Sequence, residues 1–302
     1  MTLMLQARER RYELGARPWL MGIVNATPDS FSDGGVHATL EARVALAREL
    51  LAAGADVIDV GGETGRTNLP AVPVAEEIAR VVPLIERVAG ELGALVSVDT
   101  YKPAVAAAAI AAGAAIVNDV SGLRDAGLAD VCAASGAALV VMHTRAAPKQ
   151  RMQDPGLYDD VVADVLAFLR ERLALARDRG VAETALIVDP GPDFAKTPAQ
   201  TIELLRGAER LHELGRPLLM AISRKDFIGA LTGRPPRERD AGTLAALAHG
   251  LDLGGHIFRV HDVAAAADFI AVRGALRGEL EPPSEPGLPE ALRAETPPQR
   301  VS

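Results

Sequence analysis

Short apolar runs alternate with longer segments of helical spacing over most of this chain. The apolar runs are nearly continuous rather than alternating, which is typical of parallel strands buried on both faces. The segments between them are rich in Ala and Leu, with polar residues interleaved at helical spacing. The pattern predicts strands in WLMGIVN, DVIDVGG, LVSVDT, IVNDVS, ALVVMHT, LIVDPG, LLMAISRK and HIFRVHD.

A weak internal repeat accompanies these strands. In four places a predicted helix ends in Gly and a strand follows that closes on polar residues, and Gly there fits a left-handed helix cap. Eight βα units in about 260 residues predict an α/β fold, a single (β/α)₈ TIM barrel over residues 19–280. The alternative is an open doubly wound sheet, which more often carries a glycine-rich dinucleotide loop after its first strand. The sequence has no such loop there.

Both ends of the chain differ from this pattern. Residues 1–18 hold no long apolar run, so we interpret them as an N-terminal extension and expect no signal peptide. Residues 281–302 are rich in Pro and Glu and poor in large apolar side chains, which predicts a disordered tail. No apolar stretch is long enough to cross a membrane. We therefore expect a soluble, cytoplasmic protein without a membrane partner.

The net charge bears on the possible partners of the protein, and the cysteine content bears on its compartment. The formal net charge is -8, which argues against a nucleic-acid partner because a phosphate backbone attracts a basic face. The one cysteine, Cys132, has no second cysteine in the chain with which to form a disulfide, which fits a reducing compartment. We interpret Cys132 as a small buried residue on a helix.

Polar or charged residues stand where the predicted strands end. In a (β/α)₈ barrel these carboxyl ends form the active-site face. Any single polar strand end is compatible with plain solvent, but acids, amides and bases converging at one rim are better explained by a ligand. The rim residues are Asn25, Asp59, Glu63, Asp99, Asn118, Asp119, His143, Asp189, Arg224, Lys225, Arg259 and His261.

One group of rim residues suits a planar heterocycle. Asp99, Asn118 and Asp189 follow buried strands and offer short acceptors or amides to a ring with several N–H donors. Without such donors, buried carboxylates would be costly. Lys225 is suited to a ring carbonyl or ring nitrogen.

A second group suits an anionic, phosphate-like part of the ligand. It contains Arg66 and Arg259, because guanidinium is a planar, bidentate phosphate donor, together with His261 and Asn25. A divalent ion held by phosphate oxygens and the amide oxygen of Asn25 favours Mg²⁺.

Structural explanations compete at several of these positions. Asp99 precedes a Lys-Pro pair, so its carboxylate is also a candidate cap for the next helix. His143 we interpret as a satisfied core histidine, and Asp59 is a candidate for backbone bonds in a tight turn. Arg224 and Lys225 are adjacent in an extended strand, so we expect only one of them to face the ligand.

Eight sequence blocks resemble those of dihydropteroate synthases. In chain order they are MGIVNATPDSFSDGG, VIDVGGE, SVDT, NDVSG, VVMH, IVDPG, SRKDFIG and FRVHDV, over about residues 19–277. The first block and the SRK and RVHD pair are the most specific. The resemblance implies a (β/α)₈ barrel that joins 6-hydroxymethyl-7,8-dihydropterin diphosphate to p-aminobenzoate, releasing pyrophosphate with Mg²⁺ present, in folate synthesis. It also implies a homodimer.

The resemblance implies a role for each matching residue. The pterin would be bound by Asp99, Asn118, Met142, Asp189 and Lys225. The diphosphate would be met by Asn25, Arg66, Arg259 and His261, with Asn25 on the metal. The arylamine would lie near Gly65, Thr67, Phe194 and Asp226. Catalysis would fall to Asp99, Asp189, Lys225 and Arg259. Phe31 and Asp33, in the loop after the first strand, would join a closed state.

The match departs from the family where the arylamine is expected. The family's second loop usually reads GGESTRPG, whereas residues 61–68 read GGETGRTN, and DPGFGFGK is replaced by DPGPDFAK at residues 189–196. Asp226 adds a carboxylate near the expected site of a carboxylate-bearing substrate. We therefore expect a working synthase with an altered arylamine pocket and altered sulfonamide sensitivity.

Two alternatives remain. The first is a pterin-binding paralogue without synthase activity. The second is a methyltetrahydrofolate-type methyltransferase, against which Lys225, Arg259 and Arg66 argue because that substrate has no pyrophosphate.

Overall fold

The computed structural model describes residues 2–27, 39–65, 67, 69–281 and 292. Phe31, Asp33 and Arg66, for which the sequence predicts roles, lie outside these residues, as does most of the predicted tail. The chain forms two compact units, Met1–Ala267 and Asp268–Ser302. All the strands belong to the first unit.

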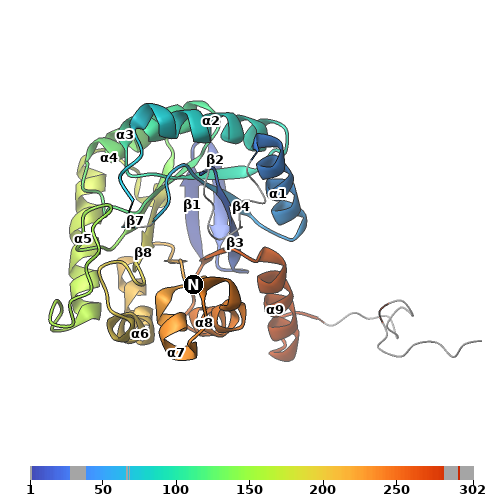
Figure 1. The fold of residues 1–302 in the computed structure, drawn as a ribbon, viewed down its shortest axis with the longest axis vertical. Helices are drawn as coiled ribbons and strands as arrows, with labels where there is room; N and C mark the ends of the chain where they lie inside the picture. The colour runs from blue at the N-terminus through green and yellow to red at the C-terminus, as the bar shows by residue number, and fades with distance from the viewer. Residues whose placement is uncertain (1, 28–38, 66, 68, 282–291, 293–302) are drawn as a thin grey trace, which may run out of the picture. The chain divides into compact units, whose positions relative to one another are not determined.

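Eight parallel strands form one closed sheet in the first unit (Figure 1). Its order is β8-β7-β6-β5-β4-β3-β10-β9. The two outer strands meet through a bridge between Val188 and Leu218, and the Val188 N–H donates to the Pro217 carbonyl at 3.0 Å. The sheet therefore closes on itself, which confirms the predicted barrel. The strands are β3 (Trp19–Asn25), β4 (Val57–Gly61), β5 (Leu95–Asp99), β6 (Ile116–Asp119), β7 (Ala138–Met142), β8 (Leu186–Asp189), β9 (Leu219–Met220) and β10 (Ile257–Val260).

Helices follow the strands in the alternation that the sequence predicts, and Figure 1 shows α1 to α6 ranged around the sheet. The predicted left-handed glycine caps are present, for example at Gly113 (φ 120°) and Gly136 (φ 70°). The α-helices are α1 (Leu40–Ala52), α2 (Val74–Gly90), α3 (Pro103–Ala111), α4 (Gly127–Ser135), α5 (Val161–Asp178), α6 (Pro198–Arg206), α7 (Asp226–Thr232), α8 (Asp240–Asp252) and α9 (Val263–Leu276). The 3₁₀ helices are η1 (Glu183–Ala185), η2 (Ala208–Leu214) and η3 (Pro236–Glu238).

The segment before the barrel forms a hairpin that the sequence analysis did not predict. Strand β1 (Leu3–Ala7) pairs antiparallel with β2 (Arg10–Leu14). Leu5, Ala7 and Leu14 are buried in one cluster with residues near the amino ends of the barrel strands, among them Val57 and Ile116. The hairpin thus covers the end of the barrel opposite the carboxyl ends. The alternation of Leu3, Leu5 and Ala7 was the available signal.

The two-residue period of the strands decides which side chains enter the barrel. Val57 belongs to the core cluster, so Asp59 points to the same inner face. The register then pairs Asp59 with Ser97, and Asp99 with Asn118. Above an apolar layer, the barrel therefore carries a polar layer at the carboxyl ends of its strands.

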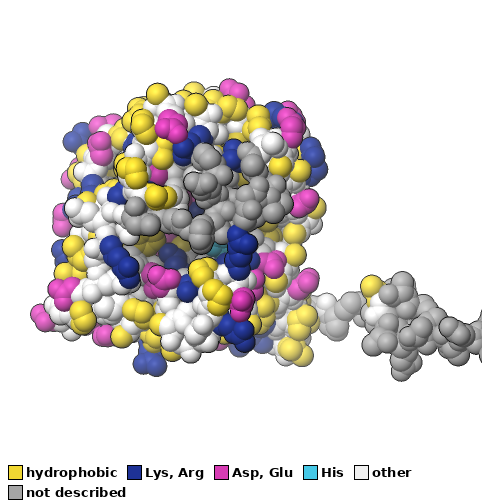
Figure 2. Space-filling view, viewed as in Figure 1, with side chains coloured by type: hydrophobic (Ala, Val, Ile, Leu, Met, Phe, Trp, Pro, Cys, Tyr) yellow, Lys and Arg dark blue, Asp and Glu magenta, His cyan; other side chains and the backbone are white. Residues whose placement is uncertain are grey.

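Charges of both signs are interspersed on the face of the molecule drawn in Figure 2. Across the described residues, several charges form ion pairs at the surface, such as Arg87 with Glu41 at 2.8 Å. Of the helices in the described ranges, none combines the length and the apolar character needed to span a membrane.

Candidate active site

The carboxyl ends of the barrel strands surround a cavity of about 610 Å³. A cavity of this size is typical of small-molecule sites. Every residue with a predicted binding or catalytic role within the described part of the chain lines it, although the residues come from all eight strand–helix units of the barrel. These residues are Asn25, Gly65, Thr67, Asp99, Asn118, Met142, Asp189, Phe194, Lys225, Asp226, Arg259 and His261. The structure thus brings the predicted site together, while the role of each residue stays a prediction.

A network of ion pairs forms the floor of this cavity. The Nε of Arg259 donates to Asp59 Oδ2 at 2.6 Å, and its Nη2 donates to Asp99 Oδ2 at 3.0 Å. The Nδ2 of Asn118 donates to the same oxygen of Asp59 at 3.3 Å. Asp59 is fully buried and orients both Arg259 and Asn118, rather than making a backbone turn. The sequence analysis placed Asp59 on the rim but assigned it no role in the site.

Burial sets the protonation of the acids at this floor. It raises the pKa of Asp99 to about 7, although the Arg259 guanidinium opposes the change. Burial also raises the pKa of Asp189, against the opposing effect of the Gly191 N–H, which donates to Asp189 Oδ1 at 2.7 Å. The Asp99 side chain does not cap helix α3, whose N-cap residue is Lys102. Asp99 and Asp189 are therefore available to a ligand.

The adjacent cations Arg224 and Lys225 both line the cavity, and they lie in a turn after β9 rather than in the predicted extended strand. Arg224 has a left-handed backbone (φ 56°), and its Nε donates to Asp240 Oδ1 at 2.8 Å. The Lys225 ammonium instead lies 4.4 Å from the centre of the Phe194 ring, and burial lowers its pKa. Lys225 is the cation that turns towards the predicted substrate residues.

His261 enters the cavity as a neutral imidazole. Burial, together with the nearby Arg224 and Arg259, lowers its pKa to about 3. Its Nδ1 lies 2.9 Å from Ser223 Oγ, and this oxygen accepts the His261 backbone N–H at 3.2 Å. Because the Ser223 hydroxyl can both donate and accept, this contact orients the ring. His261 therefore presents a neutral imidazole to a ligand.

The sequence profile of the pterin binding enzyme family matches residues 21–261, a span that contains seven of the barrel strands completely and β3 from Met21 onwards. The chain belongs to this family. It is 43% identical to the dihydropteroate synthase of Bacillus subtilis over 245 residues, which is 81% of this chain and 83% of that protein.

Two solved structures of the Xanthomonas albilineans dihydropteroate synthase are similar to this one. The complex with 4-aminobenzoic acid has a TM-score of 0.84 and 45% identity, covering 92% of this chain and 99% of that one. The complex with 7,8-dihydropteroate has a TM-score of 0.78 and 46% identity, covering 88% of this chain and 96% of that one. The resemblance inferred from the eight sequence blocks is therefore confirmed.

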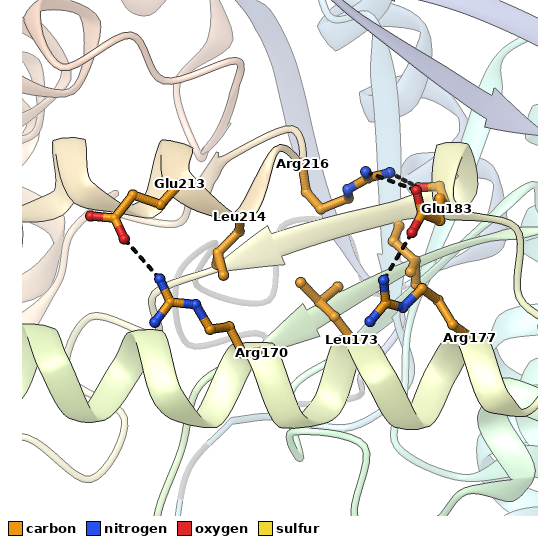
Figure 3. Close-up of a pocket in the computed structure, with 8 residues that line it drawn as sticks. Arg170, Leu173, Arg177, Glu183, Glu213, Leu214 and Arg216 are labelled. Atoms are coloured by element: carbon orange, nitrogen blue, oxygen red, sulfur yellow. Dashed lines mark hydrogen bonds and ion pairs between the residues drawn. The ribbon is translucent and has the colours of Figure 1, made fainter.

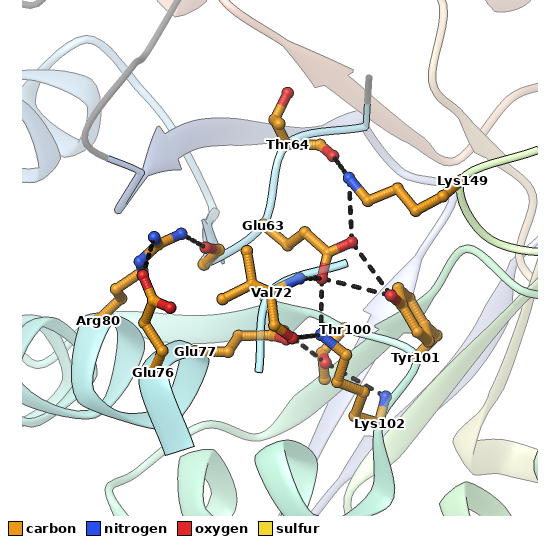
Figure 4. Close-up of polar contacts among 11 residues, drawn as sticks. Glu63, Thr64, Val72, Glu76, Glu77, Arg80, Thr100, Tyr101, Lys102 and Lys149 are labelled. Atoms are coloured by element: carbon orange, nitrogen blue, oxygen red, sulfur yellow. Dashed lines mark hydrogen bonds and ion pairs between the residues drawn. The ribbon is translucent and has the colours of Figure 1, made fainter. Parts of the chain in front are cut away.

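In this member of the pterin-binding family, Glu63 ties the loop after β4 to two neighbouring loops (Figure 4). Its carboxylate pairs with Lys102 Nζ at 2.6 Å and with Lys149 Nζ at 3.0 Å. It also accepts the Tyr101 hydroxyl at 3.1 Å and the Val72 N–H at 3.0 Å. Burial alone would raise the pKa of Glu63, but the two ammonium groups and the Val72 N–H lower it overall. Glu63 therefore stays ionised and holds the loop that carries Gly65 and Thr67.

Three other residues singled out in the sequence have structural roles. His143 is fully buried, which confirms its interpretation as a core histidine. Asp119 accepts the backbone N–H of Ser121 at 2.7 Å and shapes a turn. Cys132 is buried on α4, as interpreted, and burial raises the pKa of its thiol to about 12.

A second hollow, of about 320 Å³, lies between α5, η2 and the start of β8 (Figure 3). Its charges are paired with one another: Arg170 with Glu213 at 2.7 Å, and Arg177 with Glu183 at 2.9 Å. It also contains Leu186, the first residue of β8, so it lies towards the amino ends of the strands. This hollow is separate from the rim where the predicted residues meet.

The cavity residues fit a magnesium ion only if the substrate supplies most of the ligands. Across the described ranges, no group of three or more His, Cys, Asp or Glu side chains is arranged to hold a metal ion. Asn25 lines the cavity at the end of β3 and offers one amide oxygen. Mg²⁺ is commonly bound by one or two protein oxygens with phosphate oxygens and water. A diphosphate with Asn25 meets that requirement.

Proposed function

We propose that this protein joins 6-hydroxymethyl-7,8-dihydropterin diphosphate to p-aminobenzoate, forming dihydropteroate and releasing pyrophosphate in folate synthesis. The observation that carries the proposal is the meeting of Asp99, Asn118, Asp189 and Lys225 in one cavity of a pterin-binding enzyme. The dihydropteroate synthases among its relatives support the same activity.

The pterin ring binds at the floor of the cavity. Its N–H groups donate to the carboxylates of Asp99 and Asp189, and Asn118 supplies an amide that can both donate and accept. Asp59 holds Asn118 in place through the bond at 3.3 Å. Lys225 donates to a ring carbonyl or ring nitrogen, and Met142 packs against the ring. Because Asn118 and Asp189 are buried, their bonds to the ring gain strength from the low dielectric of the site.

The diphosphate lies beside Arg259 and His261. A guanidinium has five N–H donors, and Arg259 directs donors from Nε and Nη2 to Asp59 and Asp99. Its remaining donors can meet phosphate oxygens, and the neutral His261 adds a ring nitrogen beside them. Asn25 would hold Mg²⁺, which when bound would supply positive charge to the phosphate oxygens.

In the reaction, the amine nitrogen of p-aminobenzoate forms a bond to the pterin methylene carbon. The bond from that carbon to the diphosphate oxygen breaks, its electron pair leaves with the pyrophosphate, and the amine releases one proton to water. Negative charge develops on the leaving pyrophosphate, where Arg259 stabilises it without having to reorganise. The loops that carry Gly65, Thr67 and Phe194 hold the arylamine near the carbon, which lowers the entropic cost of the encounter.

The arylamine side of the cavity differs from the usual family sequence, so we propose an altered arylamine pocket. The carboxylate of Asp226 does not stand alone there, because it pairs with Arg239 at 3.0 Å. This pairing reduces its repulsion of a substrate carboxylate. Altered sulfonamide sensitivity follows, since Gly65 and Thr67 replace the usual residues.

The test is formation of dihydropteroate by the purified protein from the two substrates with Mg²⁺. No product at high enzyme concentration would remove the proposal. A paralogue without synthase activity would bind pterin diphosphate in calorimetry, yet release no pyrophosphate when arylamine is added. A methyltransferase would bind methyltetrahydrofolate in preference to pterin diphosphate.

We further propose that the protein works in the cytoplasm as a homodimer and does not bind nucleic acid. The dimer is tested by sedimentation at micromolar protein concentration, where a monomer would contradict it. Removing Mg²⁺ with a chelator should slow turnover strongly in the wild type. The effect should be smaller in Asn25→Ala, because this variant already lacks the side chain that binds the ion.

A further inference from the structure

Lys196 is fully buried beside the cavity, and the proposed chemistry does not use it. Burying an ammonium group is costly unless its donors have partners. Three acceptors surround its Nζ: His143 Nδ1 at 2.8 Å, the Gly191 carbonyl at 2.8 Å and the Phe194 carbonyl at 3.0 Å. Since an ammonium has three N–H groups, each one has a partner.

His143 connects Lys196 to helix α5. Because Nδ1 accepts from Lys196, the ring proton sits on Nε2, which lies 3.1 Å from Asp164 Oδ1. Burial and the Lys196 ammonium lower the pKa of His143 to about 3, so the imidazole is neutral. Its ring also packs edge-on against Phe168, with 4.8 Å between ring centres. The imidazole is thus held on two sides and determines where the ammonium lies.

The two carbonyl partners of Lys196 belong to the loop between β8 and α6, residues 190–197. Gly191, Asp193 and Ala195 all have positive φ angles, of 65°, 66° and 53°. This backbone conformation is uncommon for residues that carry a Cβ, and it persists only where the surroundings impose it. The bonds from Lys196 to the Gly191 and Phe194 carbonyls hold both ends of the turn, and the Tyr158 hydroxyl, which donates to the Ala195 carbonyl at 2.9 Å, adds to them.

This loop presents Phe194 to the cavity and to Lys225. The Lys225 ammonium lies 4.4 Å from the centre of the Phe194 ring. The Asp193 carboxylate accepts the backbone N–H of Asp226, so the loop also contacts the first residue of α7. A shift of the loop would therefore move two side chains that line the cavity.

We propose that Lys196 is a positioning residue for the reaction, which holds Phe194 against Lys225 from outside the cavity and so shapes the surface that the arylamine meets. The inference rests on the proposed function. Lys196 touches neither substrate, because its three donors are spent on His143, Gly191 and Phe194.

The charged form of Lys196 is needed for all three bonds. Burial lowers its pKa to about 7, with Asp189 opposing and Lys225 reinforcing the change. The other titratable groups that face it are His143, Asp164 and Asp193. Above this pH the neutral amine has two N–H donors for three acceptors, so the loop loses one bond. We expect the arylamine KM to rise as the pH increases through about 7.

The test compares Lys196→Met, which keeps the length of the side chain and removes its donors, with Leu173→Ala. Leu173 is buried in α5 and does not line the cavity, so its truncation lowers stability alone. We expect Lys196→Met to raise the arylamine KM about tenfold or more, with a smaller change in pterin diphosphate affinity. Its arylamine KM should also lack the rise with pH that the wild type shows. Leu173→Ala should lower Tm and leave both KM values unchanged.

An arylamine KM in folded Lys196→Met equal to that of the wild type, between about pH 6 and pH 9, would overturn the proposal. Hydrogen exchange of the amides of residues 191–197 gives a measurement independent of turnover. We expect it to be faster in Lys196→Met by about tenfold, and equal exchange would also overturn the proposal. If the wild type forms no dihydropteroate, the proposed function fails, and exchange alone decides whether Lys196 holds the loop.

Discussion

Replacing Glu63 with Gln should destabilise the protein by about 3 kcal/mol. The Glu63 side chain is only 5% exposed and forms ion pairs with Lys102 and Lys149. Removing one partner of a buried ion pair costs about 3–5 kcal/mol. In the variant, Lys102 keeps its bond to Glu77 at 2.5 Å, and the 14% exposed side chain of Lys149 keeps some contact with water. Both ammonium groups are thus partly stabilised, so we expect a loss at the lower end of the range of about 3–5 kcal/mol.

The assay is urea denaturation, in which ΔG falls linearly with urea concentration and an unchanged slope means an unchanged fold. Glu76→Gln is the matched control, since it is the same substitution in a separate ion pair close by (Figure 4). Glu76 is 51% exposed and pairs with Arg80 one helical turn away, a contact worth about 0.3–0.5 kcal/mol. Arg80 also keeps its bond to the Gly62 carbonyl at 2.9 Å. The two variants should differ by more than about 2 kcal/mol.

Equal stabilities of Glu63→Gln and Glu76→Gln would refute the reasoning, because the buried charges would then contribute no more than a surface pair. Glu63→Gln should also raise the arylamine KM more than the pterin diphosphate KM, since Glu63 holds the loop that carries Gly65 and Thr67. An equal rise in both KM values would mean that Glu63 does not act through that loop.

Three further outcomes follow from the floor of the cavity and from His143. Asp189→Asn keeps the acceptor for the Gly191 N–H but removes the charge of the side chain. The affinity for pterin, measured by calorimetry, should fall by about 1.5–3 kcal/mol, or roughly 10- to 150-fold. Unchanged binding would contradict the assignment of Asp189 to the pterin site. Arg259→Lys keeps one charge but loses the fork of donors, so pterin diphosphate should lose more affinity than the pterin alcohol; equal losses would contradict a phosphate role. The pKa of His143 is lowered from 6.5 to about 3. Between these pH values the unfolded state therefore binds one more proton than the folded state. The free energy of unfolding falls as the pH drops through this range, by up to about 1.4 kcal/mol per pH unit. His143→Gln should have a shallower acid dependence in urea denaturation, and an identical slope would disprove this contribution.

Much of the fold could be predicted from local patterns. The eight apolar runs contain the eight barrel strands, and most of the polar residues at their ends line one cavity. Periodicity worked because a strand buried on both faces needs apolar side chains on each side. It missed the β1–β2 hairpin, where the alternation of Leu3, Leu5 and Ala7 is short and the segment was interpreted only as an extension.

The partners of the polar side chains could not be predicted in the same way. The sequence analysis placed Asp59 and Glu63 on the rim without showing that Asp59 holds Arg259 and that Glu63 holds Lys149. It also assigned no role to Lys196, which closes the β8–α6 loop against His143.

The sequence by itself determined the order of strands and helices, and the fact that acids, amides and cations end the strands. These are properties of neighbouring residues, whose spacing sets the side of a strand or helix on which they lie. Only the tertiary structure decided which of these groups touch. Closing the sheet brings β10 beside β3, so that Arg259 reaches carboxylates on β4 and β5. A contact of that kind depends on the closed barrel and leaves no periodic trace in the chain.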